Sequence, residues 1–69
     1  MKNKTTFKVG DTILYVGAED EIHGEIADVA EVFKDSDGEW FVVFNLHRDG
    51  MEWGAPAKDC RLVKSLKAA

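Results

Sequence analysis

Short hydrophobic runs separated by polar turns cover most of the chain. The clearest pattern lies in residues 29–46, where two runs rich in β-branched and aromatic residues flank the polar cluster Asp35 to Glu39. This arrangement is typical of a β-hairpin. Gly38 can adopt a positive φ without a steric clash, and aspartate and serine side chains can hydrogen-bond the turn backbone. The pattern therefore predicts a hairpin at the centre of the fold.

The second strand of this hairpin is expected to form the floor of the hydrophobic core. Alternate side chains of a strand point to opposite faces of the sheet. Large apolar residues occupy every position of one face, and Phe33 of the preceding strand is expected to join them in the core. The apolar residues of this face are Trp40, Val42, Phe44 and Leu46.

The rest of the chain predicts further short strands. Residues 12–16 are β-branched or aromatic at most positions, and residues 51–55 and 61–63 have the composition of shorter strands. Residues 56–60 are expected to form a single helical or 3₁₀ turn, because the proline at position 56 presets φ at its start.

The apolar residues of the strand predicted at 25–33 do not alternate perfectly. A β-bulge or a strong bend would reconcile their spacing with one buried face. A helical stripe over residues 19–34 also fits the spacing, but the enrichment in valine, isoleucine and phenylalanine favours a strand. The core candidates here are Ile26, Val29, Val32 and Phe33.

Five short strands in a chain of 69 residues indicate one small all-β domain. Such a domain is expected to be a five-stranded antiparallel barrel. The hydrophobic fraction of 45% is sufficient for a folded core. We place the domain at residues 7–63, between flexible tails at residues 1–6 and 64–69.

Four segments of the chain resemble those of SH3-like barrels, most closely the KOW and Tudor types and small barrel subunits of larger complexes. The resemblance implies a five-stranded SH3-like barrel with one short 3₁₀ turn before the last strand. It also implies partner binding through loops and one open face, without specifying a ligand. The four segments are VGDTILY (9–15), HGEIADV (23–29), WFVVF (40–44) and PAKDCRLV (56–63).

Acidic and basic residues are unevenly distributed. All 13 acidic residues lie between Asp11 and Asp59, whereas most basic residues lie near the two ends of the chain. Nucleic-acid binding that is independent of sequence requires clustered lysine and arginine, so the acidic body disfavours it unless the two ends converge. The residues that a KOW- or Tudor-like nucleic-acid site would use are Lys8, Arg48, Arg61 and Lys64.

Three aromatic residues are candidates for contact with a protein partner. A barrel this small holds few side chains, so Tyr15, Phe41 and Trp53 are not all expected to fit inside it. On the surface they would form a groove for an extended peptide or a cage for a cation, and otherwise they would cover the open ends of the barrel. Trp53 is the strongest candidate, because tryptophan is enriched at binding hot spots.

An acidic loop is expected to form the rim of this aromatic surface and to steer a basic partner toward it. The simpler interpretation is a solvated loop. A third hypothesis is that the acidic chain inhibits a nucleic-acid-binding protein by mimicking phosphates. The loop residues are Glu19, Asp20 and Glu21.

Catalysis and metal binding are not expected. His23, His47 and Cys60 are scattered and match no catalytic motif, and their spacing is not that of a zinc site. We therefore predict no enzyme activity, no metal and no cofactor. A single cysteine and the absence of a long apolar run indicate a cytoplasmic protein without a membrane segment. The sequence thus predicts a protein-binding adaptor or accessory subunit, and pairing of strand edges leaves a homodimer open.

Overall fold

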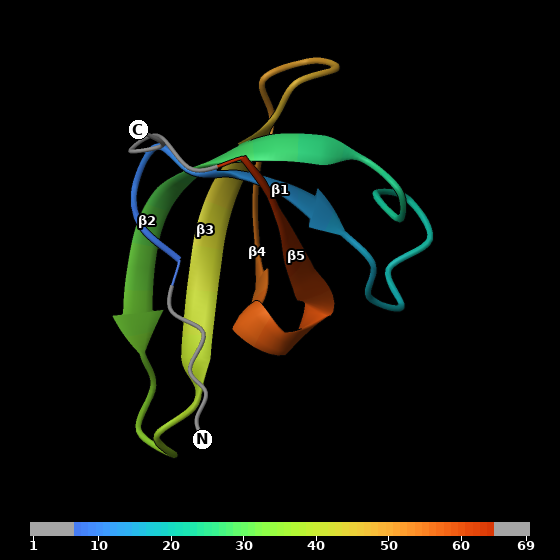
Figure 1. Cartoon of the computed structure of the whole chain (residues 1–69). Coiled ribbons are helices and arrows are strands. Elements are labelled where there is room, and N and C mark those ends of the chain that lie inside the picture. The colour runs from blue at the N-terminus through green and yellow to red at the C-terminus, as the bar shows by residue number, and fades with distance from the viewer. Residues whose placement is uncertain (1–6, 65–69) are drawn as a thin grey trace.

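Residues 7–64, the part of the chain that the computed structural model describes, contain five β-strands and one 3₁₀ turn joined by loops (Figure 1). The predicted all-β fold with a short 3₁₀ turn before the last strand is confirmed. The helical alternative for residues 19–34 is wrong, because most of that segment is a strand. The elements are β1 (Thr12–Tyr15), β2 (Ile26–Lys34), β3 (Trp40–Leu46), β4 (Glu52–Pro56), η1 (Ala57–Asp59) and β5 (Cys60–Lys64).

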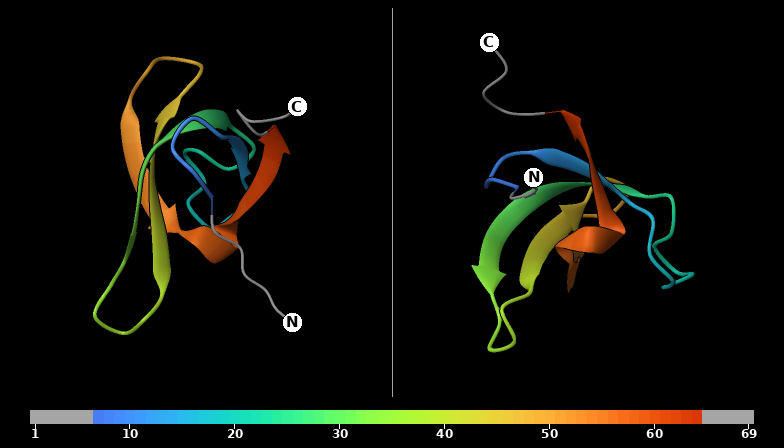
Figure 2. Two further views of the ribbon diagram at one scale, coloured as in Figure 1. Left: turned by 60° about the vertical axis from the view of Figure 1, so that its left-hand side comes forward. Right: turned by 60° about the horizontal axis from the view of Figure 1, so that its bottom comes forward.

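All five strands belong to one antiparallel sheet with the order β4-β3-β2-β1-β5. The sheet curls strongly, and η1 joins its two edge strands (Figure 2). No strand pairing joins β4 to β5 within residues 7–64, so the sheet is not closed. The predicted tails at residues 1–6 and 65–69 lie outside the described residues, whereas Lys64 belongs to β5.

The turn between β2 and β3 is stabilised by the side chain of Asp35. Its Oδ1 accepts hydrogen bonds from the backbone N–H groups of Asp37 and Glu39, each at 2.9 Å. Gly38 has a φ of 85° and donates its N–H to the Asp35 carbonyl. The turn residues identified in the sequence therefore act as predicted, because an aspartate side chain and a glycine at positive φ suit a tight turn.

Strand β2 contains the bulge that its imperfect alternation predicts. The register with β3 shifts between Val29 and Glu31, which adds one residue to β2. Val29 points into the core before the bulge and Val32 packs against the core after it. Phe33 consequently points outward and is 42% exposed, so its predicted place in the core is wrong. Ile26 is only half-buried.

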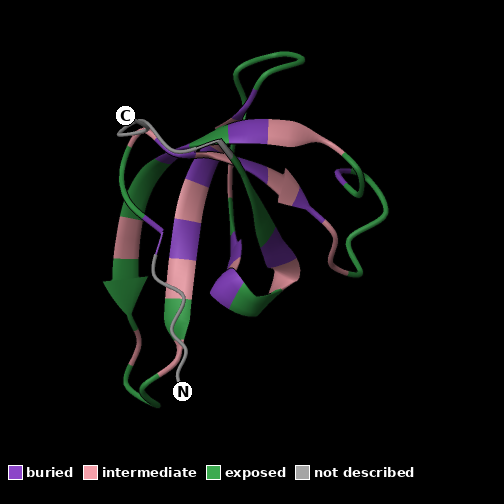
Figure 3. Ribbon diagram, viewed as in Figure 1, coloured by how far each residue is buried: buried purple, intermediate pink, exposed green. Residues whose placement is uncertain are grey.

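The core lies on the inner face of the curled sheet. Val42, Phe44 and Leu46 of β3 are buried as predicted (Figure 3). Trp40 is 39% exposed, so its predicted core position is wrong. It begins β3 opposite Lys34, beyond the core, and the ammonium group of Lys34 lies 5.2 Å from the centre of its ring.

Candidate partner-binding surface

Tyr15 is a core residue, so the prediction that it lies on the surface is wrong. It is 4% exposed, and its ring centre lies 6.2 Å from that of Phe44. Its hydroxyl group accepts a hydrogen bond of 3.2 Å from the backbone N–H of Glu19. Tyr15 therefore anchors the start of the acidic loop from inside the fold and is not free to contact a partner.

Trp53 lies on the inner face of β4, directly opposite Phe44 in the strand pairing. It is partly buried and packs against the core. Its indole Nε1 is buried and finds no hydrogen-bond partner among the described residues. An unsatisfied buried N–H group is costly. The apolar contacts of the Trp53 ring with the core therefore hold the side chain in this position. It lies apart from Phe41, which occupies the opposite face of the sheet.

Phe41 lies on the outer face of the sheet, where it is half-buried. Its ring stacks on that of Phe33, with centres 5.8 Å apart and an angle of 15° between the planes. Pro56 lies opposite Phe41 on β4, and Val43 is the next outward residue along β3. These four residues form a continuous apolar patch, which we call the apolar strip: Phe33, Phe41, Val43 and Pro56.

Only Phe41 of the apolar strip is among the site residues that the sequence predicts. The others are missed because their orientation depends on long-range pairing. Phe33 reaches the outer face only through the bulge in β2, and Pro56 reaches the strip only through the register of β4 with β3. Alternation along β3 marks Val43 as an outward neighbour of Phe41, so this residue could have been found from the sequence.

Two carboxylates adjoin the apolar strip. Glu31 lies opposite Val43 on β2, and Glu52 is an outward residue of β4. Within the described part of the chain, neither side chain makes a hydrogen bond or an ion pair. The outward positions of β2, β3 and β4 contain no lysine or arginine. Within residues 7–64, the outer face therefore combines apolar side chains with negative charge that no ion pair compensates.

The acidic loop does not border the apolar strip. Its three exposed residues lie in the connection between β1 and β2, which projects away from the β2–β3 hairpin in Figure 1 and in the right-hand view of Figure 2. The structure thus separates the two parts of the predicted surface, Phe41 on one side and the loop on the other. The loop residues are Glu19, Asp20 and Glu21.

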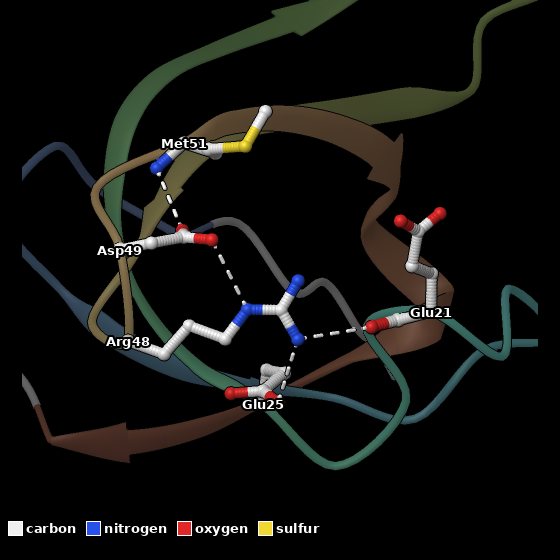
Figure 4. A network of polar contacts seen from close by, with 5 residues as sticks. All are labelled: Glu21, Glu25, Arg48, Asp49 and Met51. Carbon is white, nitrogen blue, oxygen red and sulfur yellow. Dashed lines mark hydrogen bonds and ion pairs between the residues drawn. The ribbon is translucent and has the colours of Figure 1, made fainter.

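Arg48 connects the β3–β4 loop to the β1–β2 loop (Figure 4). Its Nη1 donates to the carbonyl oxygen of Glu21 at 3.2 Å and to Glu25 Oε2 at 3.1 Å, and its Nε donates to Asp49 Oδ2 at 3.2 Å. The backbone N–H of Met51 donates to the other oxygen of Asp49. This bond, and to a smaller extent the bond from Arg48, lowers the pKa of the Asp49 carboxyl. The positive charge of Arg48 is therefore compensated by two carboxylates.

Of the four residues of the alternative nucleic-acid site, Arg48 is engaged in the loop network. Lys8 is exposed just before β1, and Arg61 is exposed on β5 opposite Leu14. Lys64 lies opposite Thr12 at the end of β5. Only Arg48 of this set therefore has its charge compensated by carboxylates among the described contacts.

The residues considered for catalysis have separate hydrogen-bond partners. Burial, with a smaller contribution from Asp59, raises the pKa of the Cys60 thiol to about 11, so the reactive thiolate is scarce near neutral pH. His23 Nδ1 lies 2.8 Å from the Gly17 carbonyl oxygen, and His47 Nε2 lies 2.8 Å from Asp28 Oδ1. No group of three potential metal ligands occurs within residues 7–64.

The contact between His47 and Asp28 predicts a small dependence of stability on pH. The hydrogen bond from His47, followed by that from Thr12, lowers the pKa of the Asp28 carboxyl below its ordinary value of 3.8. The folded state therefore binds fewer protons than the unfolded state, so the stabilisation is present above about pH 4 and is lost as the pH falls through the lowered pKa. Because both side chains are exposed, we expect at most about 1 kcal/mol.

Urea unfolding of wild type and Asp28→Asn at pH 7 and pH 3 tests this expectation. The difference in the free energy of unfolding between the two proteins should be largest at pH 7 and should shrink at pH 3. Asp20→Asn is the matched control, because Asp20 is exposed and makes no side-chain hydrogen bond or ion pair within residues 7–64. An equal effect of Asp28→Asn at both pH values would contradict the role of this contact.

The comparisons with known proteins give no family for this chain. No family model matches it, and neither a curated protein nor a solved structure matches it. The resemblance to SH3-like barrels therefore stays a prediction from the sequence. Residues 7–64 contain no helix that is long and apolar enough to cross a membrane.

Proposed function

We propose that this protein is a non-catalytic protein-binding module, an adaptor or accessory subunit, that docks through the apolar strip. The observation that carries the proposal is the stack of Phe33 and Phe41 on the outer face, flanked by Pro56. The solvated face of an antiparallel sheet usually carries polar side chains. Adjoining apolar side chains on such a face mark an interaction site.

The chemistry of the apolar strip suits a protein partner. Aromatic rings provide a large contact area and lose little conformational entropy on binding, and they are enriched at the centres of protein interfaces. The core does not need these rings, because its own cluster of buried residues lies on the inner face. Phe33 and Phe41 are therefore available for contact at the surface without any rearrangement of the sheet.

The test is affinity purification of the full chain from lysate with and without nuclease treatment, with wild type compared with Phe33→Thr/Phe41→Thr. Threonine preserves strand propensity. We expect recovery of specific partner proteins to fall at least tenfold, which corresponds to about 1.4 kcal/mol and is modest for two hot-spot aromatics. Trp40→Thr removes an exposed aromatic from the opposite face of β3 and should leave recovery unchanged.

Two outcomes would contradict the proposal. Equal recovery of partners by the folded double variant would show that the apolar strip is not the docking surface. Partners that are no longer recovered after nuclease treatment would favour the alternative of a nucleic-acid-binding module. The exposed basic residues Lys8 and Arg61 would then contact the nucleic acid.

A further inference from the structure

We infer that the apolar strip receives an extended segment of a partner protein in which a lysine or arginine lies two residues from a large apolar residue. This inference rests on the proposed function and specifies its partner. It is drawn from three features of the outer face: the row of apolar residues, an open space over Gly54, and the two uncompensated carboxylates Glu31 and Glu52.

The outward residues of β2, β3 and β4 form rows across the sheet. Phe33, Phe41 and Pro56 form one row, because Phe41 pairs with both of the others. The next row along the strands consists of Glu31, Val43 and Gly54. Successive rows are two residues, or about 7 Å, apart. An extended partner segment has the same repeat, so its alternate side chains can lie over successive rows.

The second row is open at Gly54. A Cβ atom added to Gly54 would have one neighbour within 4 Å, the Val42 carbonyl oxygen at 3.7 Å, apart from the adjoining residues of the chain. No side chain of residues 7–64 therefore fills this space. Gly54 is also not one of the glycines at positive φ, so its backbone does not require glycine. A glycine within a strand often marks the close approach of another backbone or a ligand.

The charge of the outer face selects a basic segment. Glu31 lies in the same row as Gly54, and Glu52 precedes Gly54 by two residues on β4. Neither carboxylate has an ionic partner among the described residues. A cation placed over Gly54 would lie one row from Phe41, within the reach of a side chain two residues from the apolar anchor. The net charge of −4 would also attract a basic partner over longer distances.

Selection from a random library of displayed ten-residue peptides against the immobilised full chain tests this inference. We expect the enriched peptides to carry lysine or arginine two residues from a large apolar residue. Synthetic copies should bind in fluorescence anisotropy, at least tenfold more weakly when the basic residue is replaced with glutamate. Their affinity should also fall with added salt.

Gly54→Val is the decisive variant, because it fills the open space and removes no contact. Valine is favoured in strands, so we expect an unchanged or higher Tm together with at least a tenfold loss of affinity for the selected peptides. Glu31→Gln/Glu52→Gln should cause a similar loss. Glu19→Gln/Glu21→Gln removes the same charge from the acidic loop and should leave the affinity within about twofold of wild type, because loop and strip are separate.

The possible failures are distinguishable. Selected peptides that lack the basic residue but lose binding in Phe33→Thr/Phe41→Thr would overturn this inference and leave the proposed function intact. Peptides that bind equally well to that double variant would count against both. Three further results would overturn the inference that an extended basic segment lies over Gly54. The first is unchanged peptide binding by a folded Gly54→Val, and the second is an equal loss of affinity in Glu19→Gln/Glu21→Gln. The third is a selection that enriches no peptide.

Discussion

Replacing Phe44 with alanine is expected to remove most of the stability of this protein. Phe44 is fully buried in β3, opposite both Val29 and Trp53, and its ring lies beside that of Tyr15. Truncating a buried phenylalanine costs about 3–5 kcal/mol, because contacts are lost and a cavity remains. A single domain of this size has a free energy of unfolding of roughly 3–10 kcal/mol. We expect a strongly reduced urea midpoint or the absence of a cooperative transition.

Phe41→Ala is the matched control for Phe44→Ala. The chemical change and the strand are the same, but Phe41 points to the outer face and is half-buried. Its truncation should cost clearly less than that of Phe44, because the side chain loses fewer contacts and leaves no enclosed cavity. Equal losses of stability in the two variants, measured by circular dichroism in urea, would show that the inner and outer faces of β3 are wrongly assigned.

Gly17→Ala is expected to destabilise the protein by about 1–3 kcal/mol, the range for overpacking a filled site. A Cβ atom at Gly17 would lie 2.6 Å from Cζ of Tyr15 and 2.8 Å from Cγ of Asp59. The Tyr15 ring is buried and its hydroxyl group is hydrogen-bonded to Glu19, so it has little freedom to move. Each kcal/mol should lower Tm by about 4–8 °C for a domain of this size.

Thermal unfolding of Gly54→Ala provides the control for Gly17→Ala. The added Cβ atom at Gly54 would make one ordinary contact at 3.7 Å, so this variant should be at least as stable as wild type. If Gly17→Ala were equally stable, the Tyr15 ring would be free to move, and its assignment as a fixed anchor of the acidic loop would be wrong.

Local structure was predictable because it depends on residues that are close in the sequence. The turn at Asp35 and Gly38 forms from its own side chain and backbone, and Pro56 immediately precedes the 3₁₀ turn. The alternation along β3 identified Val42, Phe44 and Leu46 as core residues for the same reason. The strands and the floor of the core therefore follow from short-range patterns.

The assignment of aromatic residues to faces was not predictable to the same degree. Trp40 fits the alternation of β3, but the core ends before it, and Lys34 lies over its ring instead. Tyr15 reaches the core because β1 lies between β2 and β5, a placement that no local signal specifies. The Arg48 network likewise joins loops more than twenty residues apart in the sequence.

The bulge in β2 has a consequence for how this surface can change in evolution. The extra residue between Val29 and Val32 reverses the facing of everything after it, which is why Phe33 lies outside. Loss of one codon there would leave a single residue of β2 opposite Val43, so Val32 would still point inward and Phe33 outward. The stacked pair of the apolar strip would therefore survive a shortening of β2 at the bulge, whereas loss of one residue from a regular part of a strand reverses every face beyond it.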